Sequence, residues 1–239
     1  MCYKKDRVTV AYRTIKRAFD IVASFLGIVV TLPVWLIAII GIEVSDPGPV
    51  FYVANRIGKD NKAFRMFKFR SMRVDKKADE RSFKAETSRI FPFGALIRRL
   101  KIDELPQLLN ILVGDMSVVG PRPAAKDQLD TVRAGRFAAT AEMLPGLTGP
   151  GALYDYIYGD TVEDEAEYRE KVLPTRLVLE VYYVRNKSVL YDIRMIWYTV
   201  VCVVCSIFGK EPKRIFSELL RAADLMNEKM PETANAGKE

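Results

Sequence analysis

Two adjacent carboxylates, Asp103 and Glu104, lie in the segment LKIDELPQLLNIL at residues 100–112. The 239-residue chain contains no histidine, which excludes catalytic triads that need an imidazole and metal clusters built on histidine. Any metal would therefore be held by oxygen ligands, as suits a hard cation such as Mg²⁺. The acid pair could carry out catalytic chemistry, or it could stabilise the start of a helix.

Helix capping is the simpler explanation for Asp103. Apolar residues recur at helical spacing after the acid pair, namely Leu105, Leu108, Leu109 and Leu112. Proline is tolerated only in the first turn of a helix, so Pro106 predicts a helix that begins near Asp103. Aspartate is a favoured N-cap residue, and acids in the first turn suit the helix dipole.

Two stiff loops and several arginines indicate a phosphate-binding site. In GDMSVVGPRP, residues 114–123, prolines on both sides of Arg122 restrict the backbone. A guanidinium held in this way can bind phosphate oxygens with two hydrogen bonds. LPGLTGPG at 144–151 is a second rigid loop, and Arg98 and Arg99 precede the acid pair.

A β-hairpin is predicted at residues 50–72, where two β-rich runs flank the turn sequence GKDNK. In the second run, Lys68 and Arg70 share one face of the strand, opposite Phe67 and Phe69. This basic face could contact phosphate, or it could simply be solvated.

The longest uncharged run, residues 21–42, has about the ~20 residues that a membrane span needs. Pro33 interrupts the run, and basic residues flank it on both sides. The positive-inside rule therefore places both ends in the cytoplasm, as a re-entrant helix bent at Pro33 would. A kinked span remains the alternative, because proline is tolerated in spans whose neighbours satisfy the freed carbonyl.

A second apolar run, Met195–Phe208, has only 14 uncharged residues and aromatic and basic neighbours. It is typical of a helix lying in the membrane interface, with a buried core helix as the alternative. The net charge of +7 suits an anionic membrane or phosphate-bearing substrates. It does not indicate a nucleic-acid partner, because the basic residues are spread out and mixed with acids.

Together these segments resemble the bacterial sugar transferases, the monotopic phosphoglycosyl transferases. The resemblance covers most of the chain and rests on IKRAFDIV, DPGPVFYVANRIGKDNKAFRMFKFRSM, LPGLTG and YYVRNKSVLYDIRMI. Its most specific part is GALIRRLKIDELPQLLNILVGDMSVVGPRP.

The resemblance implies a mainly helical protein with a small β-hairpin, a re-entrant helix bent at Pro33 and interfacial amphipathic helices. It also implies transfer of a sugar 1-phosphate from a UDP-sugar to polyprenyl (undecaprenyl) phosphate. The products are polyprenyl-diphospho-sugar and UMP, and the cofactor is Mg²⁺. The catalytic domain would lie on the cytoplasmic face of the bacterial inner membrane, where surface glycans such as exopolysaccharide, capsule or O-antigen begin.

Residue roles carried over from the family start with Asp103 as the nucleophile, which forms a phospho-aspartyl-sugar intermediate, and Glu104 as its partner. Both acids would hold the metal. Arg122, Arg98, Lys68 and Arg70 match phosphate-contacting positions. An ionised carboxylate needs no general base to attack phosphorus, which is consistent with the absence of histidine.

The chain departs from the family at two places. Many members continue PGITGWAQVNGR where this chain has PGLTGPGALYDYIYG, so ligand contacts inferred from that loop do not transfer. Many also place serine before the bend proline, where this chain has Leu32, so a hydroxyl for the bend would come from Thr31 or elsewhere.

Four segments are expected. Residues 1–45 form the basic N-terminus and membrane helix, 46–188 the catalytic domain, 189–228 the interfacial helices and 229–239 a disordered tail. The sequence leaves the sugar and a homodimeric state open. The alternative function is a catalytically silent membrane scaffold of the same fold for glycan assembly.

Overall fold

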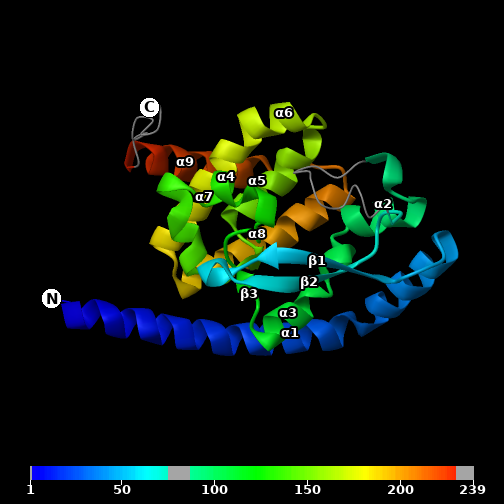
Figure 1. The fold of residues 1–239 in the computed structure, drawn as a ribbon, viewed down its shortest axis with the longest axis horizontal. Helices are drawn as coiled ribbons and strands as arrows, with labels where there is room; N and C mark the ends of the chain where they lie inside the picture. The colour runs from blue at the N-terminus through cyan, green and yellow to red at the C-terminus, as the bar shows by residue number, and fades with distance from the viewer. Residues whose placement is uncertain (1, 75–86, 230–239) are drawn as a thin grey trace.

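The computed structural model describes residues 2–74 and 87–229, with side chains from residue 12 onward. The predicted disordered tail lies almost wholly outside the described residues. Helices dominate, and the strands form two small two-stranded sheets (Figure 1). The predicted fold class, mainly helical with a small β-hairpin, is confirmed.

Helix α1, Cys2–Ser45, runs along one side of the molecule and curves in its second half (Figure 1). Pro33 lies inside it and removes one backbone donor. The Thr31 hydroxyl donates to the carbonyl of Gly27 at 2.6 Å and accepts from the Trp35 indole at 3.1 Å. Such back-bonding by threonine favours a bend, so Thr31 contributes the hydroxyl expected beside the proline.

The first half of α1 is fixed to the rest of the protein by buried polar contacts. Lys16 forms an ion pair with Asp192 at 2.9 Å, and Asp20 accepts from the Ser117 hydroxyl and the Val118 backbone. Arg17 donates to the last carbonyls of helix α3, Gln107–Val113, where a cation suits the helix dipole. Residues before the apolar run are therefore held against the protein body.

The end of α1 returns to the same body. Ala38 and Ile42 are buried with Phe69, Phe91 and Ile97. Just beyond the helix, the Asp46 carboxylate pairs with Arg70 at 3.1 Å. Residues at both ends of the apolar run thus contact the body of the protein.

Strands β1, Phe51–Ile57, and β2, Ala63–Phe69, form the predicted antiparallel hairpin, with Phe51 opposite Phe69. Asp60 and Asn61 turn the chain with positive φ angles of 54° and 56°. Aspartate and asparagine tolerate this left-handed conformation better than most residues, which explains GKDNK as a turn.

Two short strands link the two stiff loops of the sequence analysis, residues 114–123 and 144–151, by pairing with each other. Strand β3, Ser117–Val119, pairs in parallel with β4, Gly146–Thr148. A Cβ atom at Gly146 would lie 2.1 Å from the backbone nitrogen of Gly120. Glycine is required there because the two backbones approach so closely.

Helix α7, Leu173–Asn186, forms the centre of the largest core, with Leu177, Leu179, Val181 and Tyr183 almost fully buried. Helices α5 and α9 pack against it. The remaining helices are α2 (Pro92–Arg99), α3 (Gln107–Val113), α4 (Leu129–Val132), α5 (Pro150–Ile157), α6 (Glu165–Glu167), α8 (Val189–Ile207) and α9 (Lys213–Lys229).

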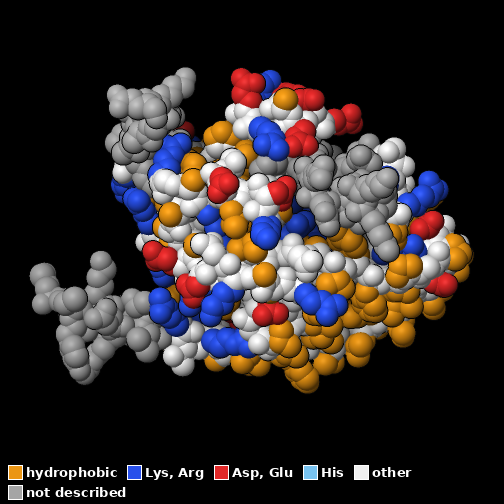
Figure 2. All heavy atoms as spheres, viewed as in Figure 1, with side chains coloured by type: hydrophobic (Ala, Val, Ile, Leu, Met, Phe, Trp, Pro, Cys, Tyr) orange, Lys and Arg blue, Asp and Glu red, His pale blue; other side chains and the backbone are white. Residues whose placement is uncertain are grey.

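The segment Tyr12–Ser45 and helix α8 are both long and apolar enough to cross a membrane, and few residues of either are buried. Helix α8 places Asp192, Met195 and Cys202 against the body and leaves Leu190 and Trp197 exposed. A buried core helix, the alternative for this run, is therefore wrong. Apolar side chains also gather along α1, at the lower right of Figure 2.

Candidate active site

The acid pair lies in a tight 3₁₀ turn, Ile102–Glu104, that follows α2. Lys101 opens this turn in a left-handed conformation with φ 56°, and the Glu104 amide donates to the Lys101 carbonyl. The α-helix begins only at Gln107, and Asp103 makes no capping hydrogen bond. The capping interpretation of Asp103 is therefore wrong, because no side-chain capping hydrogen bond starts either the turn or the helix that follows it.

Asp103 is 5% exposed, and its Oδ1 atom is buried with no hydrogen-bond partner among the described residues. Buried polar atoms are nearly always paired in folded proteins, so an exception indicates a missing ligand or a functional constraint. Oδ1 of Asp103 is therefore an exception of this kind.

Lys68 reaches the acid pair because β2 is fixed to α3. The buried Asn110 accepts from the Phe67 amide at 2.9 Å and donates to the Arg65 carbonyl at 2.7 Å. Lys68, next along the strand, forms an ion pair with Glu104 at 3.1 Å. The predicted basic strand face therefore contacts the acids through Lys68.

The two neighbouring acids differ in their electrostatics. Burial, together with the charge of Glu104, raises the pKa of Asp103, although Lys68 and Arg98 oppose the shift. Burial also disfavours charge on Glu104, but Lys68, Lys101 and Arg122 outweigh it and lower its pKa to about 2. Glu104 is thus firmly ionised, and Asp103 is the more basic oxygen of the pair.

Arg122, on the Pro-Arg-Pro loop, lines the same cavity as the two acids. Its Nη1 atom lies 3.1 Å from Oδ2 of Asp155 on α5, and the charge of Asp155 is the main reason that the pKa of Arg122 is raised. The Arg122 side chain is 41% exposed. Asp155 therefore holds one edge of the Arg122 guanidinium, and the rest of the side chain remains accessible to solvent.

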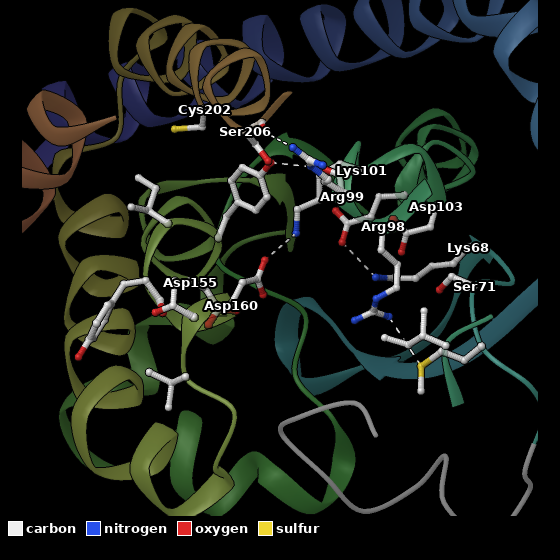
Figure 3. A pocket seen from close by; sticks show the side chains of 18 of the residues that line it. Lys68, Ser71, Arg98, Arg99, Lys101, Asp103, Asp155, Asp160, Cys202 and Ser206 are labelled. Carbon is white, nitrogen blue, oxygen red and sulfur yellow. Dashed lines mark hydrogen bonds and ion pairs between the residues drawn. The ribbon is translucent and has the colours of Figure 1, made fainter. Parts of the chain in front are cut away.

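These groups line one cavity of about 1300 Å³. Figure 3 shows Asp103, Arg98 and Lys68 gathered together, with Asp155 and Asp160 contributed by another part of the chain. Lys101 bridges toward the second group, with Nζ 3.5 Å from Asp160 and 4.4 Å from the centre of the Tyr156 ring. The cavity is large enough for a nucleotide-sized ligand.

The other predicted phosphate contacts, Arg98 and Arg70, have different surroundings. Among the described residues, Arg98 donates to the Sδ atom of Met72 at 3.7 Å, a weak acceptor, so it retains donors for a ligand. Arg70 is 5% exposed and pairs with Asp46. Both line the cavity, but the ion pair makes Arg70 the less available of the two.

Sequence reasoning missed Asp155 and Lys101. Asp155 is the one charged residue in the aromatic run GALYDYIYG, and a lone acid in such a run indicates a buried carboxylate with a partner. Lys101 carried no comparable signal, because its role depends on the left-handed turn that only the structure shows.

The described part of the chain contains no cluster of three or more His, Cys, Asp or Glu side chains that could hold a metal. Mg²⁺ does not need one, since it commonly binds one or two carboxylates together with waters and substrate phosphates. The unpartnered oxygen of Asp103 beside the ionised Glu104 fits that requirement.

Comparison with known proteins places this site in a family. The chain is 39% identical over 200 residues to the exopolysaccharide production protein PSS of Rhizobium leguminosarum bv. phaseoli, across 78% of this chain and 94% of that protein. It is 35% identical over 194 residues to the UDP-glucose:undecaprenyl-phosphate glucose-1-phosphate transferase of Escherichia coli K12, across 79% of this chain and 40% of that protein.

A UDP-N-acetylgalactosamine-undecaprenyl-phosphate N-acetylgalactosaminephosphotransferase of Aeromonas hydrophila is 35% identical over 196 residues, 79% of this chain and 43% of that protein. The chain spans less than half the length of these last two relatives. The family model described as bacterial sugar transferase matches residues 11–206. The chain therefore belongs to the bacterial sugar transferase family.

Proposed function

We propose that the chain is a phosphoglycosyl transferase that moves a sugar 1-phosphate from a UDP-sugar to undecaprenyl phosphate. The observation that carries this function is the buried, unpartnered oxygen of Asp103 in a cavity edged by Lys68, Arg98 and Arg122. The relatives from Escherichia coli and Aeromonas hydrophila are named for a UDP-sugar and undecaprenyl phosphate, which supports the same substrate classes here.

In the first step, a carboxylate oxygen of Asp103 attacks the phosphorus that bears the sugar. The bond from that phosphorus to the bridging oxygen breaks, and UMP leaves with the bond's electrons. In the second step, an oxygen of undecaprenyl phosphate attacks the same phosphorus and releases Asp103. The products are polyprenyl-diphospho-sugar and UMP, and the nucleophile is regenerated.

The cationic side chains make this attack possible. A carboxylate approaching a diphosphate is repelled, and cations placed at the phosphoryl oxygens offset the repulsion in the transition state. Arg122 and Arg98 bind the donor phosphates, while Lys68 holds Glu104 in place. The raised pKa of Asp103 makes it the more nucleophilic acid.

We further propose that Asp103 and Glu104 hold Mg²⁺. When bound, the ion would neutralise phosphate charge during the transfer. Glu104 suits the task because its pKa of about 2 keeps it ionised at any physiological pH.

The test is Asp103→Asn, with Asp115→Asn as a matched control on an exposed acid nearby. Purified protein is given a panel of UDP-sugars and undecaprenyl phosphate, and UMP release is measured. We expect no turnover from Asp103→Asn and normal turnover from the control. Mass spectrometry of the wild-type protein after donor addition should show a sugar-phosphate adduct that the variant lacks.

Normal turnover by Asp103→Asn would contradict the nucleophile assignment. A wild-type protein that releases no UMP from any UDP-sugar would instead favour the scaffold alternative.

The enzyme is proposed to sit on the cytoplasmic face of the inner membrane, with α1 entering the bilayer and returning. The support is that contacts on both sides of the apolar run, Lys16 with Asp192 and Asp46 with Arg70, reach the same domain. An undecaprenyl tail in the bilayer could then present its phosphate at the membrane surface, close to the cavity.

Cysteine labelling tests this placement. Arg13 and Lys62 are exposed residues before and after the apolar run, and each is replaced by cysteine in a background without the natural cysteines. A membrane-impermeant maleimide should label neither site in intact cells and both after lysis. Labelling of position 62 alone from outside would show a span instead.

A further inference from the structure

We propose that Asp155, held by Tyr168, is a positioning residue that orients Arg122 toward the donor diphosphate. This inference rests on the proposed function and concerns the part of the chain that departs from the common family pattern. Asp155 lies in PGLTGPGALYDYIYG, the segment from which no ligand contact could be transferred.

In the ion pair between Asp155 and Arg122, the acid is much more buried than the arginine. The Asp155 side chain is 10% exposed, whereas that of Arg122 is 41% exposed and lines the cavity. Asp155 meets a single Nη atom, and a guanidinium has five N–H donors. The acid therefore anchors one edge of Arg122 and leaves other donors for a ligand.

Asp155 is itself fixed in place. The Tyr168 hydroxyl donates to its Oδ1 atom at 2.6 Å and accepts from Nη1 of Arg176 at 2.9 Å. Tyr168 is 2% exposed and Arg176 is 6% exposed. Arg176 lies 3.6 Å from Glu180, an equally buried acid one turn further along α7. A buried chain of polar contacts thus runs from α7 to the guanidinium in the cavity.

The backbone makes room for this chain at two glycines. A Cβ atom at Gly159 would lie 2.3 Å from Oδ1 of Asp155, and one at Gly151 would lie 2.7 Å from Cγ of Glu180. The π-helical turn Tyr168–Val172 joins α6 to α7 and brings Tyr168 under Asp155. Such turns are rare and often occur at functional sites.

The charge of Asp155 persists despite its burial. Burial alone would raise its pKa, but Arg122, Arg176 and the Tyr168 hydrogen bond outweigh burial and lower it. The anchor for Arg122 is therefore a carboxylate throughout the physiological pH range. Arg122 in turn helps to lower the pKa of Glu104, and it lines the same cavity as Asp103 and Glu104.

The main test is Asp155→Asn, which keeps the shape of the side chain and removes its charge. A long arginine side chain without its anchor must be ordered by the substrate, so donor binding weakens while the chemical step persists. We expect KM for the UDP-sugar to rise about tenfold with kcat within about twofold of wild type, as for loss of uniform binding.

Two variants accompany it. Tyr168→Phe keeps the buried ring and removes only the hydroxyl, so KM should rise about threefold, less than for the loss of a charge. Asp164→Asn is the matched control, because Asp164 caps α6 and is exposed. It should leave KM unchanged.

A double-mutant cycle separates positioning from general structural damage. If Asp155 acts through Arg122, adding Asp155→Asn to Arg122→Ala should change KM by less than about twofold. A further tenfold loss in that background would overturn the inference, as would an unchanged KM in Asp155→Asn alone.

Calorimetry with UDP tests the inference without turnover. Its Kd should weaken about tenfold in Asp155→Asn, since both diphosphate and guanidinium remain present but the latter loses its orientation. Equal UDP affinity in wild type and Asp155→Asn would overturn the inference even if the transferase activity is confirmed. Weaker UDP binding in a protein that releases no UMP would support the inference and contradict the proposed function.

Discussion

Two groups of acids line the cavity, the acid wall (Asp103 and Glu104) and the support wall (Asp155 and Asp160). Comparison of Asp103 with Asp155 shows that the partners of a carboxylate, more than its burial, determine the direction of its pKa shift. Asp103 is 5% exposed and Asp155 is 7% exposed, yet the pKa of Asp103 is raised and that of Asp155 is lowered. One Asp155 oxygen meets Arg122 and the other accepts from Tyr168. Oδ1 of Asp103 has no such partner among the described residues.

The difference matches the two proposed tasks. A nucleophile must keep an oxygen free until the substrate arrives, and that oxygen costs folding free energy while it is buried without a partner. An anchor must instead be satisfied in the free enzyme, because its purpose is to hold another group still. The same residue type thus serves as the reactive group on one wall and as a support on the other.

Apart from the loss of Asp103 itself, the largest effect is expected at Arg122, which lines the cavity together with both aspartates. Arg122→Ala should lower kcat/KM for the UDP-sugar about 100-fold, since a charge-assisted hydrogen bond contributes roughly 1.5–3 kcal/mol and about 1.4 kcal/mol is tenfold. Arg122→Lys should recover part of the loss, because an ammonium keeps the charge without the planar fork. UMP release at low donor concentration gives both values, and an unchanged rate for the alanine variant would remove Arg122 from the site.

The variants Asp103→Asn and Asp155→Asn should not change the free energy of unfolding in the same direction. At pH 7 without magnesium, Asp103→Asn should unfold at the same or a higher denaturant concentration than wild type, because it removes a buried charge whose pKa is raised. Asp155→Asn should lower the unfolding free energy by about 1–2 kcal/mol, a buried-pair loss reduced by the partial exposure of Arg122.

The lowered pKa of Asp155 predicts how the stability difference between wild type and Asp155→Asn depends on pH. The folded-state pKa of Asp155 is below its ordinary value of 3.8, so its stabilisation is fully present above that value and is lost as pH falls through the folded pKa. The gap between wild type and Asp155→Asn should therefore be constant from about pH 5 to 8 and shrink in stronger acid. If Asp103→Asn and Asp155→Asn destabilised the protein by similar amounts, the proposed difference between the two aspartates would be contradicted.

A smaller effect is expected from Lys68→Met. Lys68 lowers the pKa of both Asp103 and Glu104, so its removal should raise both values. The nucleophile must be ionised, and the variant should therefore lose a larger share of its activity at pH 6 than at pH 8. The pH profile of kcat/KM checks this, with the exposed Lys62→Met as the control. A parallel profile would mean that Lys68 does not act on the acids by charge.

The acid wall and Arg122 could be predicted from the sequence because these residues lie in one contiguous motif. Asp103, Glu104 and Arg122 are separated by a single short helix and one strand, and the structure places them around one cavity. The hairpin was also predictable, since a turn sequence lies between two β-rich runs. Arg70 shows the limit of strand alternation, because β2 ends at Phe69 and the next side chain pairs with Asp46.

The support wall could not be predicted, because its contacts join elements that no local pattern relates. The partners of Asp155 lie on the Pro-Arg-Pro loop and on α6–α7, so their meeting depends on how α5 packs against α7. Strands β3 and β4 have three residues each, too few to show a period of two. The ion pair of Lys16 with Asp192 likewise depends on where α1 crosses α8.

The smallest effect is expected at Asp160, the other acid of the support wall. Asp160 lies 3.5 Å from Lys101, but its side chain is 60% exposed. Exposed ion pairs contribute about 0–1 kcal/mol and are screened by salt, so Asp160→Asn should change donor KM by less than about twofold. Comparison of donor KM for Asp160→Asn and Asp155→Asn in the same assay shows whether the support wall acts through one buried carboxylate or through its overall negative charge. A tenfold rise in KM for Asp160→Asn, equal to that for Asp155→Asn, would show that charge near the cavity matters more than the anchoring of Arg122.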